Sequence, residues 1–206
     1  MGFKESAQGP AAVPRLFVAL EVPVEVKRSL LPLMRGLGDV RWLDFDQQHL
    51  TLRFIGELDN GRAEEVVDAL GLVTGAPLEL QLRGIGHFPP RGEPRVLWAG
   101  VERNPELERL KRGIDRALTH AGLPRDERKF APHVTLARLR RPPLPDKLGA
   151  WLMRHSLYRS EPFPVSSFHL YSSWLRPDGA NYQIEASYEL APGSEPPGSG
   201  AGEWRW

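Results

Sequence analysis

One short phrase occurs twice in the chain, as HLTL at positions 49–52 and as HVTL at positions 133–136. In each copy, a histidine and a threonine alternate with two apolar residues. Successive side chains of a β-strand point to opposite faces. Each copy therefore predicts a strand whose histidine and threonine share one face while its apolar residues enter a core. Two such strands predict two similar halves that share one polar site.

The spacing of apolar residues elsewhere predicts a mixture of helices and strands. Helices are predicted at 24–37, 60–73, 105–121 and 148–155. Strands are predicted at 15–20, 40–43, 49–55, 78–85, 96–101, 133–139, 168–174 and 182–190. Pro32 predicts a kink or a late start in the first helix. Helices are too few for a doubly wound parallel sheet, so we expect an α+β fold with helices outside a curved sheet or pair of sheets.

The length of 206 residues suits one compact domain or two small lobes packed together. We expect an ordered domain over 14–190, preceded by a disordered segment at 1–13. Residues 191–206 are rich in Pro, Gly, Ser and Glu, which predicts a disordered tail. That tail contains Trp204 and Trp206, to which the sequence assigns no function.

Composition excludes several classes of site. The chain has no cysteine, which removes disulfides, thiolate metal sites and thiol nucleophiles. Its net charge of +1 gives no support for a long groove that follows nucleic-acid phosphates, but it allows a small anionic substrate or a short nucleic-acid end. No apolar run approaches the roughly 20 residues that span a bilayer. Because the first residues also lack the apolar region of a signal peptide, we expect a cytoplasmic protein.

Two histidines, His49 and His133, can divide the work of acid–base catalysis. The ordinary pKa of histidine is about 6.5, so one imidazole can take a proton from water while another gives one to a leaving oxygen. The hydroxyls of Thr51 and Thr135 can hold phosphoryl oxygens. A single His-x-Thr is more often structural, but two copies in one context favour a shared site. A metal site is disfavoured, because the phrase has no carboxylate and two ligands do not close a site.

An arginine follows each phrase and could hold a phosphate through two parallel hydrogen bonds. Arg53 has the same parity as His49, so the alternation predicts that both lie on one face. Arg138 has the opposite parity to His133 and reaches the site only if the strand bulges or ends before it.

The two phrases and their surroundings resemble the 2H phosphoesterase superfamily, and within it the LigT/ThpR-like RNA 2′,3′-cyclic phosphodiesterases, historically called 2′-5′ RNA ligases. The resemblance spans roughly residues 14–190. It includes, in the same order, RLFVAL, VRWLDFDQQHLTLRFIGEL, GIGHFPPRGEPRVLWAGV, FAPHVTLARLRR and FHLYSSWLRPDGANYQI. It implies two lobes with antiparallel sheets, related by a pseudo-two-fold axis, and one phrase on each lobe facing a central cleft.

The resemblance also implies a reaction and roles for the residues. The reaction is hydrolysis of an RNA-terminal ribose 2′,3′-cyclic phosphate to a 2′-phosphate, with breakage of the bond to the 3′ oxygen. By this likeness His49 is the proton donor to that oxygen, and His133 is the acceptor that activates water. Thr51 and Thr135 hold phosphate oxygens, and Arg138 contacts the phosphate. No metal or nucleotide cofactor is implied.

The expected ligands are RNA ends or small cyclic nucleotides, bound by a monomer with no membrane partner. The terminal base of single-stranded RNA usually stacks on an aromatic ring, for which Phe54, Phe88 and Tyr171 are candidates. Two alternatives remain open: a nucleotide or RNA-end binding module without turnover, and ligation of 2′-5′ linkages as a side activity.

Overall fold

The computed structural model describes residues 14–176 and 179–191. Its strands are β1 (Arg15–Glu21), β2 (Arg41–Trp42), β3 (His49–Glu57), β4 (Leu78–Leu80), β5 (Leu82–Phe88), β6 (Val96–Val101), β7 (His133–Arg138), β8 (Phe163–Val165), β9 (Ser167–Arg176) and β10 (Gly179–Glu189). Its helices are α1 (Val24–Leu30), α2 (Asn60–Gly71), α3 (Pro105–His120) and α4 (Pro145–His155), with a short 3₁₀ turn at Phe45–Gln47. The predicted α+β fold is confirmed.

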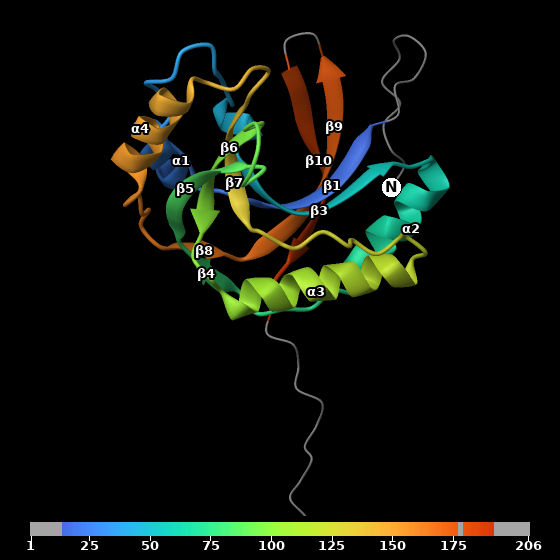
Figure 1. The fold of residues 1–206 in the computed structure, drawn as a ribbon. Helices are drawn as coiled ribbons and strands as arrows, with labels where there is room; N and C mark the ends of the chain where they lie inside the picture. Colours follow the sequence, from blue (N-terminus) through green and yellow to red (C-terminus); the bar gives the residue numbers. More distant parts are fainter. Residues whose placement is uncertain (1–13, 177–178, 192–206) are drawn as a thin grey trace, which may run out of the picture.

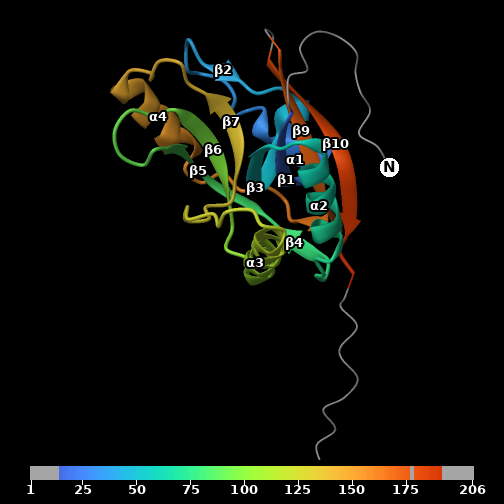
Figure 2. The same ribbon diagram turned by 90° about the vertical axis from the view of Figure 1, so that its right-hand side faces the viewer.

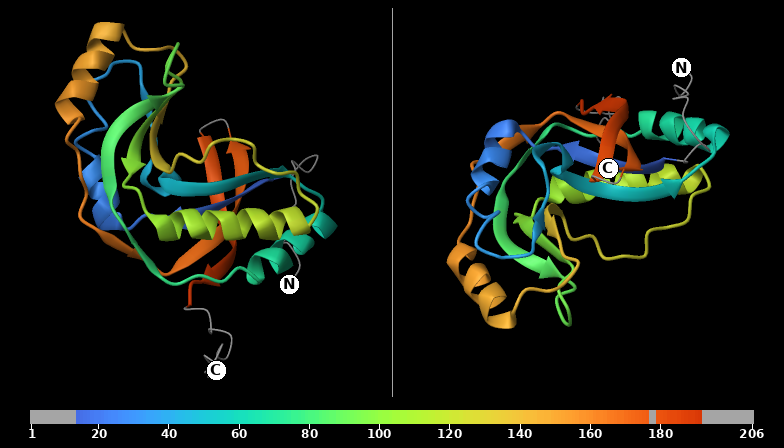
Figure 3. Two further views of the ribbon diagram at one scale, coloured as in Figure 1. Left: turned by 60° about the horizontal axis from the view of Figure 1, so that its bottom comes forward. Right: turned by 90° about the horizontal axis from the view of Figure 1, so that it is seen from above.

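Eight of the strands form one antiparallel sheet in the order β10-β9-β1-β3-β7-β6-β5, with β2 paired to β7. The two motif strands, β3 and β7, are therefore neighbours in the middle of the sheet. They pair at one position, Leu50 with Val134, whereas β3 pairs with β1 over seven positions. The sheet thus has two halves joined at this narrow contact, and the strands of the two halves run in different directions (Figure 3).

The helices divide between the two halves, as Figures 1 and 2 show. Helices α2 and α3 pack beside β3 and β10, and α4 packs beside β5. Helix α3 turns a stripe of buried residues toward the sheet: Leu107, Leu110, Ile114 and Leu118. The Asn104 side chain caps this helix by accepting a hydrogen bond of 2.9 Å from the Leu107 amide.

The predicted helix over 24–37 is too long, and the predicted kink or late start is wrong. Helix α1 ends at Leu30, two residues before Pro32. Proline has no amide hydrogen and its ring clashes with the preceding turn, so the helix cannot continue through it. The chain goes on in tight turns, in which the Leu33 amide donates to the Leu30 carbonyl at 2.9 Å.

The predicted strand over 78–85 is two strands. β4 leaves the main sheet and pairs with β8, while β5 pairs with β6. The sequence did not predict β8, because it has only three residues and one of them is Pro164.

Several predictions fall on residues that the structure does not describe. The ends predicted to be disordered, 1–13 and 191–206 with Trp204 and Trp206, lie outside the described residues except for Ala191. No helix within 14–176 and 179–191 is long and apolar enough to cross a bilayer.

The contact between the halves should be sensitive to cavities. Leu50 is buried opposite Val134, so Leu50→Ala should lower the free energy of unfolding by about 2–5 kcal/mol. Urea unfolding followed by tryptophan fluorescence measures this change. The control is Leu157→Ala, which removes an exposed side chain and should cost less than about 0.5 kcal/mol. Equal midpoints for the two variants would contradict the assignment.

Candidate active site

The two motif strands contribute to one face of the sheet, which we call the motif face. The Leu50–Val134 pairing is antiparallel, so its register aligns His49 with Thr135 and Thr51 with His133. Residues directly opposite in an antiparallel pair lie on the same face. Each histidine therefore neighbours the threonine of the other half, and the four side chains form one group.

Each motif strand contains a bulge three residues after its histidine. Along β1, Ala19 pairs with Thr51 but Val18 pairs with Arg53, so Leu52 is an extra residue. Along β6, Trp98 pairs with Thr135 but Leu97 pairs with Ala137, so Leu136 is extra. A bulge places two residues opposite one and resets the alternation of faces. Both extra leucines are buried, and so is the residue that follows each of them.

The bulge in β7 allows Arg138 to reach the motif face. The Arg138 guanidinium lies close enough to lower the pKa of both His49 and His133. Within the described part of the chain, Arg138 forms no ion pair with a carboxylate. A cation without a counter-ion beside two half-buried imidazoles is suited to an anionic ligand.

The prediction that Arg53 shares the face of His49 is wrong, because the bulge at Leu52 turns Arg53 to the other side. Arg53 is buried there and donates to the Pro124 carbonyl. Its Nη1 atom lies 3.6 Å from Asp115 Oδ1 and 3.4 Å from Asp126 Oδ2. The Arg53 guanidinium is therefore directed away from the motif face, and the next residue, Phe54, lies on that face instead.

Aromatic rings enclose His49. The Phe17 ring stacks on the imidazole at 4.8 Å between centroids, and the Tyr182 ring meets it edge-on at 5.1 Å. Tyr171 stacks on Phe17 at 5.1 Å and lies 6.0 Å from His49. Because Tyr171 is only 9% exposed, its ring supports this cluster and offers little surface for a nucleobase.

Phe54 extends the same row of rings and is far more exposed than Tyr171. Its centroid lies 6.0 Å from that of Phe17, and half of its surface is accessible.

The sequence alone did not predict that Phe17 or Tyr182 would lie at the site. The alternation in RLFVAL separates Phe17 from its leucine and valine neighbours, but only strand pairing brings it to His49.

The surroundings of His133 fix its orientation. Nδ1 lies 2.7 Å from the Ala131 carbonyl, which can only accept, so Nδ1 carries the hydrogen. In the neutral ring Nε2 is then a free acceptor. The Phe88 ring meets the imidazole edge-on at 5.0 Å and rests on Trp98 at 5.3 Å. A Cβ at Gly86 would lie 2.3 Å from Trp98, so glycine is needed there for the indole to cover β5.

Both motif histidines resist protonation. Burial, followed by the electrostatic effects of Lys27, Arg138 and His133, lowers the pKa of His49 to about 4, although a hydrogen bond to the Gln47 carbonyl opposes this shift. Burial also lowers the pKa of His133; the bond to Ala131 opposes this, and Arg138 adds to it. Both rings are therefore neutral near pH 7 in the free protein, and an anion between them would favour their charged forms.

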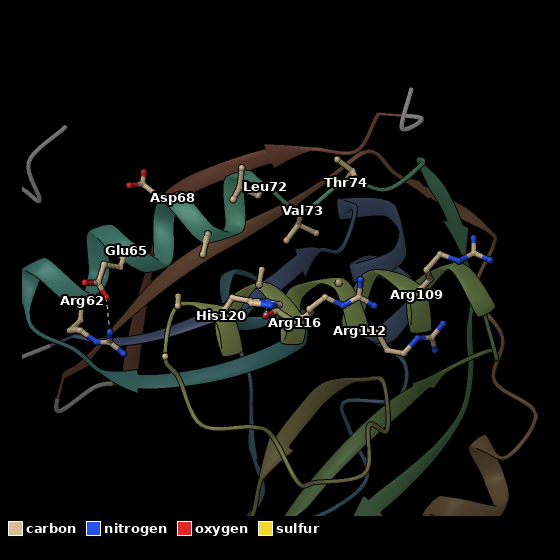
Figure 4. A pocket seen from close by; sticks show the side chains of 15 residues that line it. Arg62, Glu65, Asp68, Leu72, Val73, Thr74, Arg109, Arg112, Arg116 and His120 are labelled. Atoms are coloured by element: carbon tan, nitrogen blue, oxygen red, sulfur yellow. Dashed lines mark hydrogen bonds and ion pairs between the residues drawn. The ribbon is translucent and has the colours of Figure 1, made fainter. Parts of the chain in front are cut away.

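Two other features bear on ligands. Among residues 14–176 and 179–191, no cluster of three or more His, Asp and Glu side chains is arranged to hold a metal ion. A groove of about 1050 Å³ lies between α2 and α3, and Figure 4 shows Arg112, Arg116 and His120 along its α3 wall. None of the motif residues lines this groove.

The chain is similar in sequence to several known proteins. The sequence profile of the 2′-5′ RNA ligase superfamily matches residues 35–174. A Thermotoga maritima protein named RNA 2′,3′-cyclic phosphodiesterase is 34% identical over 182 residues, which cover 82% of this chain and 92% of the relative. A Thermus thermophilus protein of the same name is 34% identical over 189 residues, covering 85% of this chain and 90% of the relative.

Solved structures show the same fold. A crystal structure of a Thermus thermophilus protein superimposes with a TM-score of 0.69 at 31% identity, covering 85% of this chain and 97% of that one. Escherichia coli LigT in its apo form superimposes with a TM-score of 0.68 at 23% identity, covering 88% of this chain and all of that one.

Titration of the His49 imidazole, followed by NMR, should give a pKa of about 4. Arg138→Gln removes a nearby positive charge, which should raise this pKa toward the ordinary value of about 6.5. Arg103→Gln, which removes an exposed cation not among those acting on His49, is the matched control and should leave it unchanged. This description of the site would be refuted if the pKa of His49 had its ordinary value, or if Arg138→Gln left that pKa unchanged.

Proposed function

The chain belongs to the 2′-5′ RNA ligase superfamily, and we propose that it hydrolyses the 2′,3′-cyclic phosphate at an RNA end to a 2′-phosphate. The proposal rests on one observation: two half-buried histidines share one face of the sheet, and Arg138 acts on both of them. Relatives at 34% identity over most of the chain bear the name of this activity.

In this proposal His133 is the general base. Its Nε2 atom is the free acceptor, since Nδ1 is committed to the Ala131 carbonyl. The water oxygen forms a bond to phosphorus while its proton passes to Nε2. The bond from phosphorus to the 3′ oxygen breaks as the new bond forms. The 2′ oxygen stays attached, so the product is a 2′-phosphomonoester.

His49 gives its proton to the departing 3′ oxygen, and for this it must be charged. Raising its pKa from about 4 to the ordinary value of about 6.5 takes about 3 kcal/mol. A unit negative charge about 4 Å away contributes roughly 4 kcal/mol at an effective dielectric constant of 20. One bound phosphodiester is therefore sufficient to charge the acid.

Three further side chains hold the phosphate in place. The hydroxyls of Thr51 and Thr135 donate to its oxygens from the motif face, and Arg138 supplies a charged donor. The terminal base stacks on an aromatic ring, for which Phe54 offers the larger exposed face and Phe88 lies beside His133. Tyr171 acts indirectly, by supporting Phe17 and His49.

The proposal is tested with an oligoribonucleotide that ends in a 2′,3′-cyclic phosphate, in the presence of chelator. The expected product is the 2′-phosphate, resolved from the 3′-phosphate by chromatography. His49→Ala and His133→Ala should each lower kcat by about 10²–10⁴-fold, the usual contribution of general acid–base catalysis. His120→Ala, which changes a histidine in the α2–α3 groove, should leave the rate unchanged.

Other outcomes of this assay identify the alternatives. Binding of the oligonucleotide without any product would indicate a binding module. Ligated product in excess of hydrolysed product would indicate a 2′-5′ ligase. Full activity in either motif variant would contradict the roles given to the two histidines.

We also propose that residues 14–190 act as one two-lobed domain of a monomeric cytoplasmic enzyme. Light scattering of the purified chain should then give a mass near 23.1 kDa. A mass near twice that value at micromolar concentration would show a dimer instead.

A further inference from the structure

The segment between α3 and β7 fills the gap that opens where the motif strands separate. β3 and β7 pair only at Leu50 and Val134, and beyond that point Arg53 of β3 donates to the carbonyl of Pro124. Figure 1 shows this segment running back from the end of α3 to β7. The segment thus lies along β3 and leads directly to His133.

A largely buried carboxylate, Asp126, fixes the shape of this segment. It lies 3.4 Å from Nη1 of Arg53 and 3.8 Å from Nζ of Lys111. It also accepts from Nε of Arg128 at 3.0 Å and from the Arg128 amide at 3.3 Å. A buried ion network of this kind holds its members in one arrangement, so Arg128 has a defined position although 69% of its side chain is exposed.

The network has one positive charge in excess. Its cations are Arg53, Lys111 and Arg128, and its carboxylates are Asp115 and Asp126. The two inner cations share the two carboxylates, so the exposed charge of Arg128 is the one left over. Within the described residues, Nε is the guanidinium nitrogen of Arg128 that has a partner, and both terminal nitrogens are available. Two parallel donors on a fixed guanidinium match the oxygens of a phosphate.

Arg128 lies at the end of the row of rings that starts at His49. Its guanidinium lies over the Phe54 ring, 5.8 Å from the ring centre, so it covers part of one face of that ring. Phe54 is in turn 6.0 Å from Phe17, which stacks on His49. A terminal base that stacks on the remaining exposed surface of Phe54 would bring the phosphodiester that precedes it near this guanidinium.

We propose that Arg128 binds the phosphodiester that joins the terminal nucleotide of the substrate to the nucleotide before it. This inference rests on the proposed function and makes it more specific. A cyclic mononucleotide with a free 5′ hydroxyl has no such phosphate. The enzyme therefore favours RNA ends over small cyclic nucleotides, and Arg128 is the residue that distinguishes them.

The test compares two substrates that share one reacting group. These are adenosine 2′,3′-cyclic phosphate and the diadenylate that ends in the same cyclic phosphate. Arg128→Ala should lower kcat/KM for the dinucleotide roughly tenfold, the scale of one hydrogen bond to a charged group, and leave the mononucleotide within about twofold. Arg128→Lys should recover only part of the loss, because it restores the charge but not the two parallel donors. Arg116→Ala, which removes an arginine of the α2–α3 groove, should change neither value.

The same measurements can overturn the inference. An equal loss on both substrates would mean that Arg128 acts on the motif histidines through its segment, not on the second phosphate. The inference would also be wrong if Arg128→Ala left the preference for the dinucleotide unchanged, or if Arg116→Ala lowered kcat/KM for the dinucleotide as much as Arg128→Ala does. If the unaltered protein hydrolyses neither substrate, the proposed function fails, and this inference fails with it.

Discussion

Leu52 and Leu136 are each accommodated as an extra residue in a strand, three positions after a motif histidine. In an unbroken alternation, the residue five positions after each histidine would face the core. Because each bulge resets the alternation, Phe54 and Arg138 turn to the motif face instead. The aromatic surface and the cation of the site therefore both depend on a local defect in strand pairing, placed identically in the two halves.

The matched bulges also show where the halves differ. Five residues after its histidine, one half has Phe54 and the other has Arg138; four residues after, one has a buried arginine and the other has Ala137. Each imidazole bonds to the carbonyl two residues before it. Among the described residues, three aromatic rings lie around the first imidazole, and two, Phe88 and Trp98, lie beside the second. The two halves thus share a backbone arrangement but differ in the side chains around each histidine, and in the proposed mechanism this difference lets the two histidines take different roles.

The sequence predicted those helices and strands that are marked by residues within the segment itself, such as a regular spacing of apolar residues or a capping residue. The strand at 96–101 has its predicted bounds, and the capped helix at 105–121 is one residue shorter. The alternation of faces gave the wrong side of the sheet for Arg53. It assumes a regular strand, and the bulge at Leu52 cannot be recognised from the sequence. The same alternation correctly required a bulge before Arg138. Phe17 and Tyr182 reach His49 only through pairing with distant strands, which periodicity within one segment cannot show.

Enclosure of His49 has a consequence for the order of events in catalysis. Burial and the neighbouring cations keep its ring neutral in the free protein. A neutral ring that donates to the Gln47 carbonyl has no second proton to give. Arg138, which opposes the charged form while the site is empty, is itself neutralised by a bound phosphate. The phosphate thus attracts the imidazolium and weakens the field that opposed it. In the proposed mechanism His49 therefore becomes charged only when an anion is bound, and a ribose without a phosphate would leave it neutral.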